Sequence, residues 1–254
     1  MPTIIDISKP IEYNKDDPFF MRVKIRHKTH AASRWLVRLF GLPFRLFPAR
    51  FDGWADDTIE KMGVHATTHL DAPWHYGPTV NGQRARTIDE IPLEWCYGDG
   101  VVVNMAHKKD LDPITVADIQ EDLNTTGAAI EPGTIVLIRT DRDRYAGTKE
   151  YWKRGTGMSR EATEWLIDRG VKVMGIDQWG WDLPLYWQIK ESRRRADREM
   201  FWAAHLVGRQ KEYCHIEQLV NLSSLPADGF KVAVFPLKIM GASAAPARVV
   251  AILD

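Results

Sequence analysis

Few of the features that mark specialised protein classes occur in this 254-residue chain. It has only two cysteines, Cys96 and Cys214, which cannot build a disulfide framework and fit a reducing compartment. Apolar runs of roughly 18 residues, which a membrane-spanning helix needs, are missing. A phosphate-binding GxxxxGK(S/T) loop is missing too, and residues 1–10 lack the basic and apolar regions of a signal peptide. We therefore expect a cytoplasmic protein that neither spans a membrane nor binds a nucleotide.

The formal net charge of the chain is zero, because 34 Lys and Arg residues balance 34 Asp and Glu residues. This balance gives no electrostatic reason to expect nucleic acid or an anionic membrane as a partner. The chain does have 44% hydrophobic residues, enough for a sizeable α/β core, and 10 tryptophans, several of which we expect at a pocket or a subunit contact. The expected partner is a small-molecule substrate, with no nucleic acid and no membrane.

Apolar runs alternate with amphipathic segments along the second half of the chain. Residues 134–139 and 171–176 are continuous apolar runs, as in the interior strands of a sheet. Between them, Ser159 is a favourable N-cap for a helix that Gly170 can end. The pattern predicts strand–helix–strand. Because the chain has neither internal repeats nor a linker, we expect residues 1–254 to form one mixed α/β, β-rich domain.

An aromatic and basic segment, residues 34–47, departs from this pattern. Leucine, phenylalanine and tryptophan are interleaved there with arginine, and Gly41 and Pro43 interrupt the run. One interpretation is a helix that lies on a membrane surface or covers the pocket as a lid. The other is an amphipathic segment that packs on a neighbouring subunit. We favour the second, because Pro43 limits the helix to about two turns.

The most informative residues lie in the segment VHATTHLDAPWH, residues 64–75. On a helix His65 and His69 would share a face, but Asp71 and His75 would point the other way, and the proline would break the helix. In an extended chain all four share one face. A straight strand holds the Cα atoms of His65 and His69 roughly 13 Å apart. The chain must therefore bend between them if both bind one metal ion at about 2.0–2.1 Å.

Two imidazoles and a carboxylate leave a coordination position open, as in catalytic rather than structural metal sites. A lone histidine is usually a hydrogen-bonded core or surface residue, and an HxxxH pair alone is weak evidence. Four such groups that share parity, with a proline among them, are much harder to explain as scaffold. We therefore interpret the segment as a catalytic metal site.

The segment resembles the signature H-x-G-T-H-x-D-x-P-x-H of the metal-dependent cyclase family, which includes kynurenine formamidases, isatin hydrolases and trans-dienelactone hydrolases. A second block agrees with it, because His205 in the sequence AHL is followed by Glu217 in IEQLVNL. The opening IIDIS and the closing FPLKI are similar to the family's first and last strands. The likeness covers nearly the whole chain. It departs from the signature at Thr67, where the family has glycine.

The resemblance implies the following metal ligands: His65, His69, Asp71, His205 and Glu217. The first three would bind one ion, and Asp71 would share a second ion with the last two. His75 would be the acid–base group. The cofactor would be Zn²⁺ or Mn²⁺, as one ion or two, in a single cyclase domain of the swivelling β/β/α type that forms a homodimer or homotetramer. Residues from about 27 to 57 look like an insertion.

The predicted function is metal-dependent hydrolysis of an amide, formamide or lactone C–N or C–O bond in a small cyclic or aromatic substrate. Three alternatives remain open. They are an arylformamidase acting on N-formylkynurenine in tryptophan catabolism, a metal-dependent cyclase or lyase, and a non-catalytic metal-containing binding protein. The stretch from Asn14 to Pro18 departs from the Trp-Pro-Gly-Asp-like substrate segment of kynurenine formamidases.

Other residues are weaker candidates. Asp177 and Asp182 follow an apolar run and could support the site. Four tryptophans could stack on a planar substrate: Trp54, Trp74, Trp179 and Trp181. The remaining histidines are interpreted as structural or exposed: His27, His30, His107 and His215.

Overall fold

The computed structural model describes residues 1–253, and the chain forms two compact units. The larger unit comprises Met1–Pro10 and the chain from Val64 onward, and the smaller unit comprises Ile11–Gly63. The predicted insertion at residues 27–57 lies within the smaller unit. None of the helices in residues 1–253 is long and apolar enough to cross a membrane.

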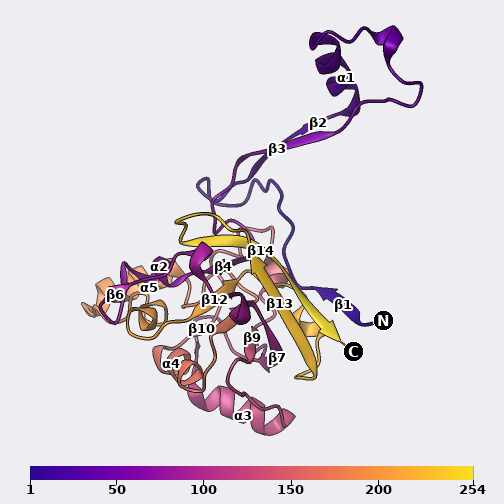
Figure 1. The fold of residues 1–254 in the computed structure, drawn as a ribbon. Helices are drawn as coiled ribbons and strands as arrows, with labels where there is room; N and C mark the ends of the chain where they lie inside the picture. Colours follow the sequence, from indigo (N-terminus) through magenta and orange to yellow (C-terminus); the bar gives the residue numbers. More distant parts are fainter. Residues whose placement is uncertain (254) are drawn as a thin grey trace. The chain divides into compact units, whose positions relative to one another are not determined.

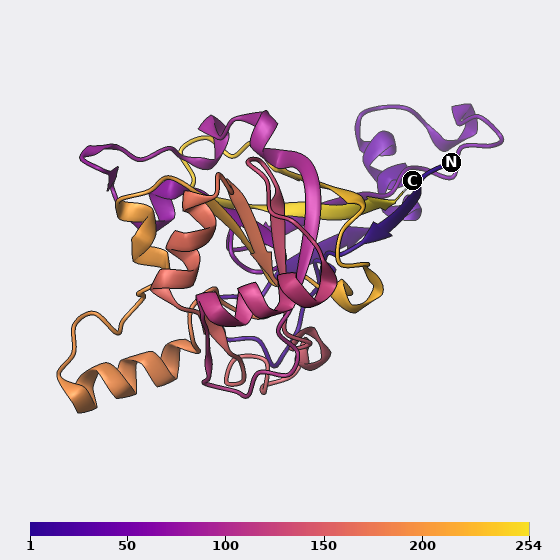
Figure 2. The ribbon, with the colours of Figure 1, turned by 90° about the horizontal axis from the view of Figure 1, so that it is seen from below.

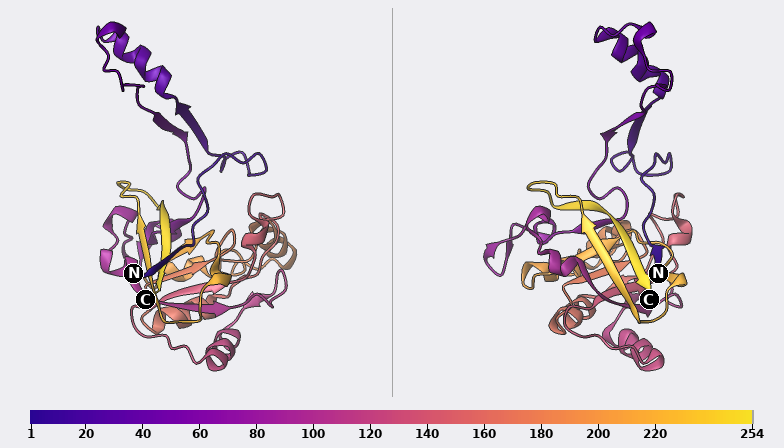
Figure 3. Two further views of the ribbon diagram at one scale, coloured as in Figure 1. Left: turned by 90° about the vertical axis from the view of Figure 1, so that its right-hand side faces the viewer. Right: turned by 45° about the vertical axis from the view of Figure 1, so that its right-hand side comes forward.

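The larger unit is built on an 8-stranded sheet with the strand order β1-β14-β13-β7-β9-β11-β12-β4 (Figure 1). Its strands are β1 (Thr3–Asp6), β4 (His69–Asp71), β7 (Tyr97–Asn104), β9 (Ile135–Arg139), β11 (Val173–Ile176), β12 (Cys214–Glu217), β13 (Phe230–Pro236) and β14 (Ala244–Leu253). Because β4 also pairs with β14, the strands from β14 round to β4 close into a barrel. β1 adds to β14 beside this ring, so the terminal strands lie side by side (Figure 3).

The mixed α/β, β-rich architecture is confirmed, whereas the closure of the barrel was not predicted. Strands β7, β9, β11 and β12 are parallel neighbours. The predicted strand–helix–strand unit is β9, α4 (Arg160–Asp168) and β11, and the side chain of Ser159 accepts a hydrogen bond from the Ala162 N–H at 3.1 Å. The assignment to the swivelling β/β/α type stays a prediction.

The remaining elements of the larger unit are short or peripheral. Its other helices are α2 (Pro73–Tyr76), α3 (Val116–Thr126) and α5 (Leu185–Arg195). Its short strands are β5 (Thr79–Val80), β6 (Gln83–Arg84), β8 (Pro113–Ile114) and β10 (Gly157–Met158). Single 3₁₀ turns are η2 (Ile88–Glu90), η3 (Leu93–Cys96), η4 (Asp143–Tyr145), η5 (His205–Arg209) and η6 (Leu222–Ser224).

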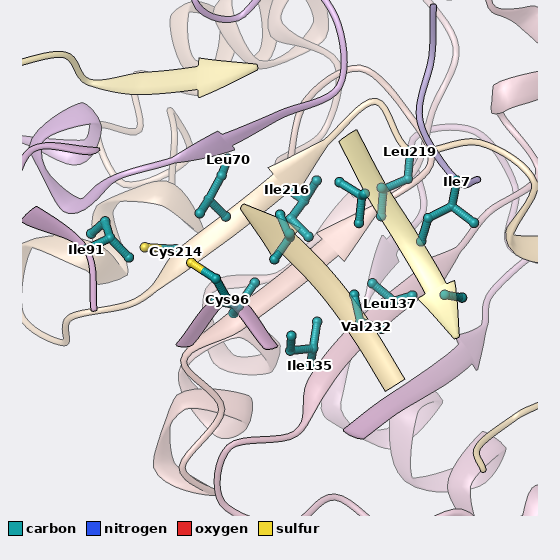
Figure 4. Close-up of a cluster of buried hydrophobic side chains, with 14 of the residues drawn as sticks. Ile7, Leu70, Ile91, Cys96, Ile135, Leu137, Cys214, Ile216, Leu219 and Val232 are labelled. Carbon is teal, nitrogen blue, oxygen red and sulfur yellow. The ribbon is translucent and has the colours of Figure 1, made fainter. Parts of the chain in front are cut away.

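The alternation of side chains along the strands produces two buried clusters. On β9, Ile135 and Leu137 join a cluster with Leu70, Ile216 and side chains of β13 and β14 (Figure 4). The intervening Val136 and Ile138 join a second cluster with side chains of α3 and α4. These two helices lie together against the sheet in Figure 2. β9 is therefore apolar on both faces, as the continuous run of residues predicts.

The smaller unit is a charged hairpin followed by a helix and an aromatic return segment. Its elements are β2 (Lys24–Lys28), α1 (His30–Leu39), η1 (Phe44–Leu46) and β3 (Asp56–Lys61). β2 and β3 pair antiparallel, and ion pairs such as Lys24 to Glu60 at 2.7 Å join them. Helix α1 ends before Gly41 and Pro43, as their backbone preferences require.

Candidate metal centre

Two antiparallel strands bring the polar groups of the centre onto one face. β4 pairs with β12 in a register that sets His215 opposite Asp71 and Glu217 opposite His69. Side chains of directly opposed residues point to the same side of a sheet. These four therefore share a face, while the intervening Leu70 and Ile216 point into the apolar core.

A bend ahead of β4 brings His65 back to this face. The chain bends at residues 66–68, where the sequence requires it, and the His65 and His69 rings lie 4.8 Å apart. Thr67, which replaces the family's glycine, is not among the described residues with positive φ, so the bend needs no left-handed conformation. Its hydroxyl donates a hydrogen bond to Lys9 O at 3.2 Å. His75 follows on α2, 4.3 Å from the His65 ring between centroids.

Asp71 is the common neighbour of the histidines, and its two oxygens face different ones. Oδ1 lies 2.9 Å from His65 Nδ1 and 3.3 Å from His69 Nε2. Oδ2 lies 3.1 Å from His215 Nε2 and 3.8 Å from His75 Nε2. Asp71 is 0% exposed. A carboxylate that is shared in this way can bridge two coordination sites.

Glu217 closes the centre on the side of β12. Its Oε1 lies 3.3 Å from His215 Nε2 and 3.6 Å from His205 Nε2, and its Oε2 lies 3.7 Å from His69 Nε2. The Trp181 N–H donates a hydrogen bond to Glu217 Oε1 at 2.8 Å. This contact fixes the orientation of the carboxylate.

Hydrogen bonds on the far side of the rings orient two of the histidines. His69 donates from Nδ1 to Thr67 O at 2.6 Å. His205 is hydrogen-bonded through Nδ1 to Asp182 Oδ2, and Asp182 also accepts the backbone N–H groups of Ala204 and His205. Both histidines are thereby held with Nε2 toward the carboxylates. Metal-binding histidines are typically anchored in the same way.

The hydrogen bonding and the spacing of the potential ligand atoms both suit a metal ion. Within the centre, four buried atoms have no hydrogen-bond partner among residues 1–253: His69 Nε2, Asp71 Oδ1, Asp71 Oδ2 and His215 Nε2. An unpaired buried polar group costs about 1–3 kcal/mol. Two ligands of one tetrahedral ion, each about 2.0–2.2 Å from it, lie about 3.3–3.6 Å apart. The 3.3 Å from His69 to Asp71 and the 3.6 Å from His205 to Glu217 match this spacing. The buried cluster is consistent with a metal ion.

The ionisation of these groups follows from burial and from their neighbours. Burial raises the pKa of Glu217, but His215 beside it outweighs burial and lowers that pKa to about 2. Burial lowers the pKa of His215, but Asp71 and Glu217 raise it to about 9. Burial lowers the pKa of His75 to about 4, against the charge of Asp71. At neutral pH the Glu217 carboxylate is thus ionised and His75 is a neutral imidazole.

All the residues that the sequence proposed for the site lie together in this centre: His65, His69, Asp71, His75, His205 and Glu217. His215, interpreted from the sequence as structural or exposed, is buried and faces both carboxylates. Its spacing of two residues from Glu217 on a strand was the available signal.

The weaker candidates separate into two groups. Asp182 supports His205, whereas Asp177 accepts hydrogen bonds from Thr140 and the Asp141 backbone instead. Trp181 stacks on His215 at 5.1 Å. The other three tryptophans have other positions: Trp179 against Trp152, Trp74 39% exposed, and Trp54 in the smaller unit.

Sequence reasoning also missed Trp202. Its ring stacks on His205 at a centroid distance of 4.5 Å and meets the edge of His75 at 5.2 Å. The backbone of Trp202 has a φ of 59°, a left-handed conformation that is rare for bulky residues. Gln188 Oε1 accepts a hydrogen bond from the Trp202 N–H at 2.7 Å. Strain of this kind is concentrated at functional sites.

The β-barrel and its buried histidine and carboxylate cluster define a class of proteins whose centre is consistent with a metal ion, and the comparisons identify the family. Residues 5–183 match the family model described as "Putative cyclase". The chain belongs to this cyclase family, and the resemblance seen in the sequence is confirmed.

Individual relatives agree with this assignment. The chain is 23% identical to the isatin hydrolase of Roseibium aggregatum over 258 residues, which cover 98% of this chain and 81% of that protein. It is 27% identical to the kynurenine formamidase of Paracidovorax citrulli over 191 residues, 74% of this chain and 76% of that protein. The structure of isatin hydrolase A from Labrenzia aggregata, solved with benzyl benzoate, matches with a TM-score of 0.75 at 25% identity, covering 99% of this chain and 94% of that chain.

Proposed function

We propose that the protein is a metal-dependent hydrolase that uses water to cleave an amide, formamide or lactone bond of a small cyclic or aromatic substrate. The observation that carries the proposal is the set of unpartnered buried atoms on His69, Asp71 and His215. Zn²⁺ and Mn²⁺ both accept imidazole and carboxylate ligands. His65, His69 and Asp71 would hold one ion, and Asp71, His205 and Glu217 would hold a second.

The bound metal would supply a water molecule of lowered pKa and would polarise the substrate carbonyl. The remaining work falls to the chain's own residues. His65 and His75 are the histidines of the centre with exposed side-chain surface, 26% and 23% respectively, so substrate would approach from their side. His75 Nε2 would take the proton of the attacking water and return it to the leaving nitrogen or oxygen. The half-buried Trp202 offers an aromatic face beside His75 and His205 for a planar substrate.

The names of the relatives support the substrate class. One relative is named as a hydrolase of isatin and another as a formamidase, and lactams and formamides both contain a carbonyl group bonded to nitrogen. Among the alternatives, N-formylkynurenine is one member of this class. A cyclase or lyase would use the same polarised carbonyl in another direction. We also propose that the protein works as a homodimer or homotetramer.

The test is a screen of formamides, isatin-like lactams and lactones with metal-loaded protein, and products are identified by mass spectrometry. Gain of one water by the substrate supports hydrolysis, and ring closure without a gain of water would contradict it. His75→Gln is expected to lower kcat by at least about 100-fold with unchanged metal content. The exposed His107 provides the matched control, His107→Gln, which should keep full activity.

A further inference from the structure

His215 lies outside the ligand set that the family resemblance implies, yet the structure places it at the centre of the buried cluster. It is 0% exposed and lies on β12 directly opposite Asp71. One nitrogen or oxygen of each of Asp71, His205, His215 and Glu217 lies within 4.8 Å of the others. A ligand role therefore requires that Nε2 of His215 is available and points into this group.

The surroundings of His215 fix its ring and occupy its other nitrogen. The ring lies between Trp181, stacked at 5.1 Å and 12°, and Tyr76, stacked at 5.2 Å and 26°. Nδ1 lies 3.1 Å from the Tyr76 hydroxyl and 3.3 Å from the Tyr213 hydroxyl. Either hydroxyl oxygen can accept the Nδ1–H. Placement of the proton on Nδ1 leaves the Nε2 lone pair free to bind a metal ion.

The geometry at Nε2 suits a metal ligand. Nε2 is 3.1 Å from Asp71 Oδ2 and 3.3 Å from Glu217 Oε1. Within residues 1–253, however, neither Nε2 nor Asp71 Oδ2 has a hydrogen-bond partner. Because His215 Nε2 and Asp71 Oδ2 are only 3.1 Å apart, their orientations do not suit a hydrogen bond between them. Ligand atoms that point at a common metal ion are arranged in this way.

We propose that His215 is a metal ligand that completes a four-ligand inner site, formed by Asp71, His205, His215 and Glu217. This inference rests on the proposed metal-dependent function. It divides the metal centre into an inner site with four protein ligands and an outer site with three. The outer site, which the family resemblance assigns to His65, His69 and Asp71, keeps three protein ligands. A closed four-ligand set is typical of a structural ion, and a three-ligand set that leaves a position open is typical of a catalytic ion. The inner ion is thus resident, and the outer ion exchanges and faces substrate.

Metal stoichiometry and release kinetics test this division. Chelator-stripped protein is reloaded with zinc, desalted and analysed for metal, and zinc loss to EDTA is then followed in time. Wild type should hold two equivalents, one released quickly and one slowly. His215→Phe keeps an aromatic ring between Trp181 and Tyr76 but removes both nitrogens, and it should lose the slow equivalent. His65→Gln should lose the fast one, and His107→Gln should behave as wild type.

The loss of affinity at the inner site should exceed the 10–100-fold that removal of a supporting residue typically costs. Cobalt loading gives an independent signal, because four-coordinate cobalt absorbs in the visible range at both sites, and His215→Phe should remove only the part of this absorption that comes from the inner site. If His215→Phe does not unfold cooperatively, the same measurements are made on His215→Gln, and its cobalt spectrum is compared with that of wild type. Two retained equivalents with wild-type release rates in either variant would overturn the role of His215 alone. Wild type that binds no metal would overturn the proposed function as well.

Discussion

Asp182 offers a prediction in which stability and metal affinity can be separated. The carboxylate is 6% exposed and accepts the Ala204 N–H at 2.8 Å, the His205 N–H at 3.1 Å and the His205 ring Nδ1–H. Asp182→Ala would leave these buried donors without an acceptor. At about 1–3 kcal/mol for each of the three unsatisfied groups, the loss is roughly 3–9 kcal/mol. That is a large part of the 5–15 kcal/mol by which a typical domain is stable.

Asp182→Asn is the more informative change. The single amide oxygen can still accept the Ala204 N–H, so the expected loss is only about 1–3 kcal/mol. The amide NH₂ group, however, would donate to His205 Nδ1 and move the ring proton to Nε2, the atom that faces Glu217. A protonated Nε2 cannot bind metal. We therefore expect the zinc affinity of the site that contains His205 to fall by about 10–100-fold.

Two assays separate the effects. Urea unfolding in EDTA gives the stability of the metal-free protein, and competition with a chromophoric chelator gives the zinc affinity. The matched control is Asp177→Asn, because Asp177 is also a buried carboxylate that accepts backbone N–H groups but serves Thr140 and Asp141 instead of the centre. If Asp182→Asn left the zinc affinity within twofold of wild type, Asp182 would not orient His205 for metal binding.

Three further predictions concern the whole chain. Zinc at roughly 100 times its Kd should raise the free energy of unfolding by about 2.7 kcal/mol and Tm by about 5–10 °C in calorimetry, and an unchanged Tm would contradict the metal centre. Burial raises the pKa of the Cys96 thiol to about 11 and that of Cys214 well above its usual range. Because the thiolate is the reactive form, neither should react with Ellman's reagent at pH 8 unless urea is added, and rapid labelling of folded protein would refute this. Leu39, the last residue of α1, and Phe40, which follows it, are each 80% exposed, so we expect them to pack on another subunit. Their joint change to Glu should lower the mass measured by light scattering, and a monomeric wild type would refute that role.

The parts of the fold that the sequence predicted depend on local signals. The cap at Ser159 and the apolar runs on either side of it predicted α4, β9 and β11, because a cap and an alternating or continuous apolar pattern act within a few residues. The barrel depends on the pairing of β4 with both β12 and β14. Those partners lie far along the chain, and no local pattern determines which strand pairs with which.

The same distinction explains what was found and missed at the centre. His65, His69, Asp71 and His75 lie within one short segment, so their shared parity was visible in the sequence. The spacing of His215 from Glu217 predicts only that both lie on one face of a strand, and the register adds that this face is opposite Asp71. Trp202 is likewise placed against His205 by a left-handed residue for which the sequence gives no warning.

Catalysis by a bound metal ion is tested most directly by titrating metal into chelator-stripped protein while measuring turnover of whichever formamide, lactam or lactone the screen identifies. Stripped protein should be inactive, and zinc or manganese should restore turnover until the sites are filled. His69→Ala, which removes the unpartnered Nε2 of a proposed ligand, should stay inactive at every metal concentration that saturates wild type. Full turnover by stripped, metal-free protein would show that the centre is not a catalytic metal site.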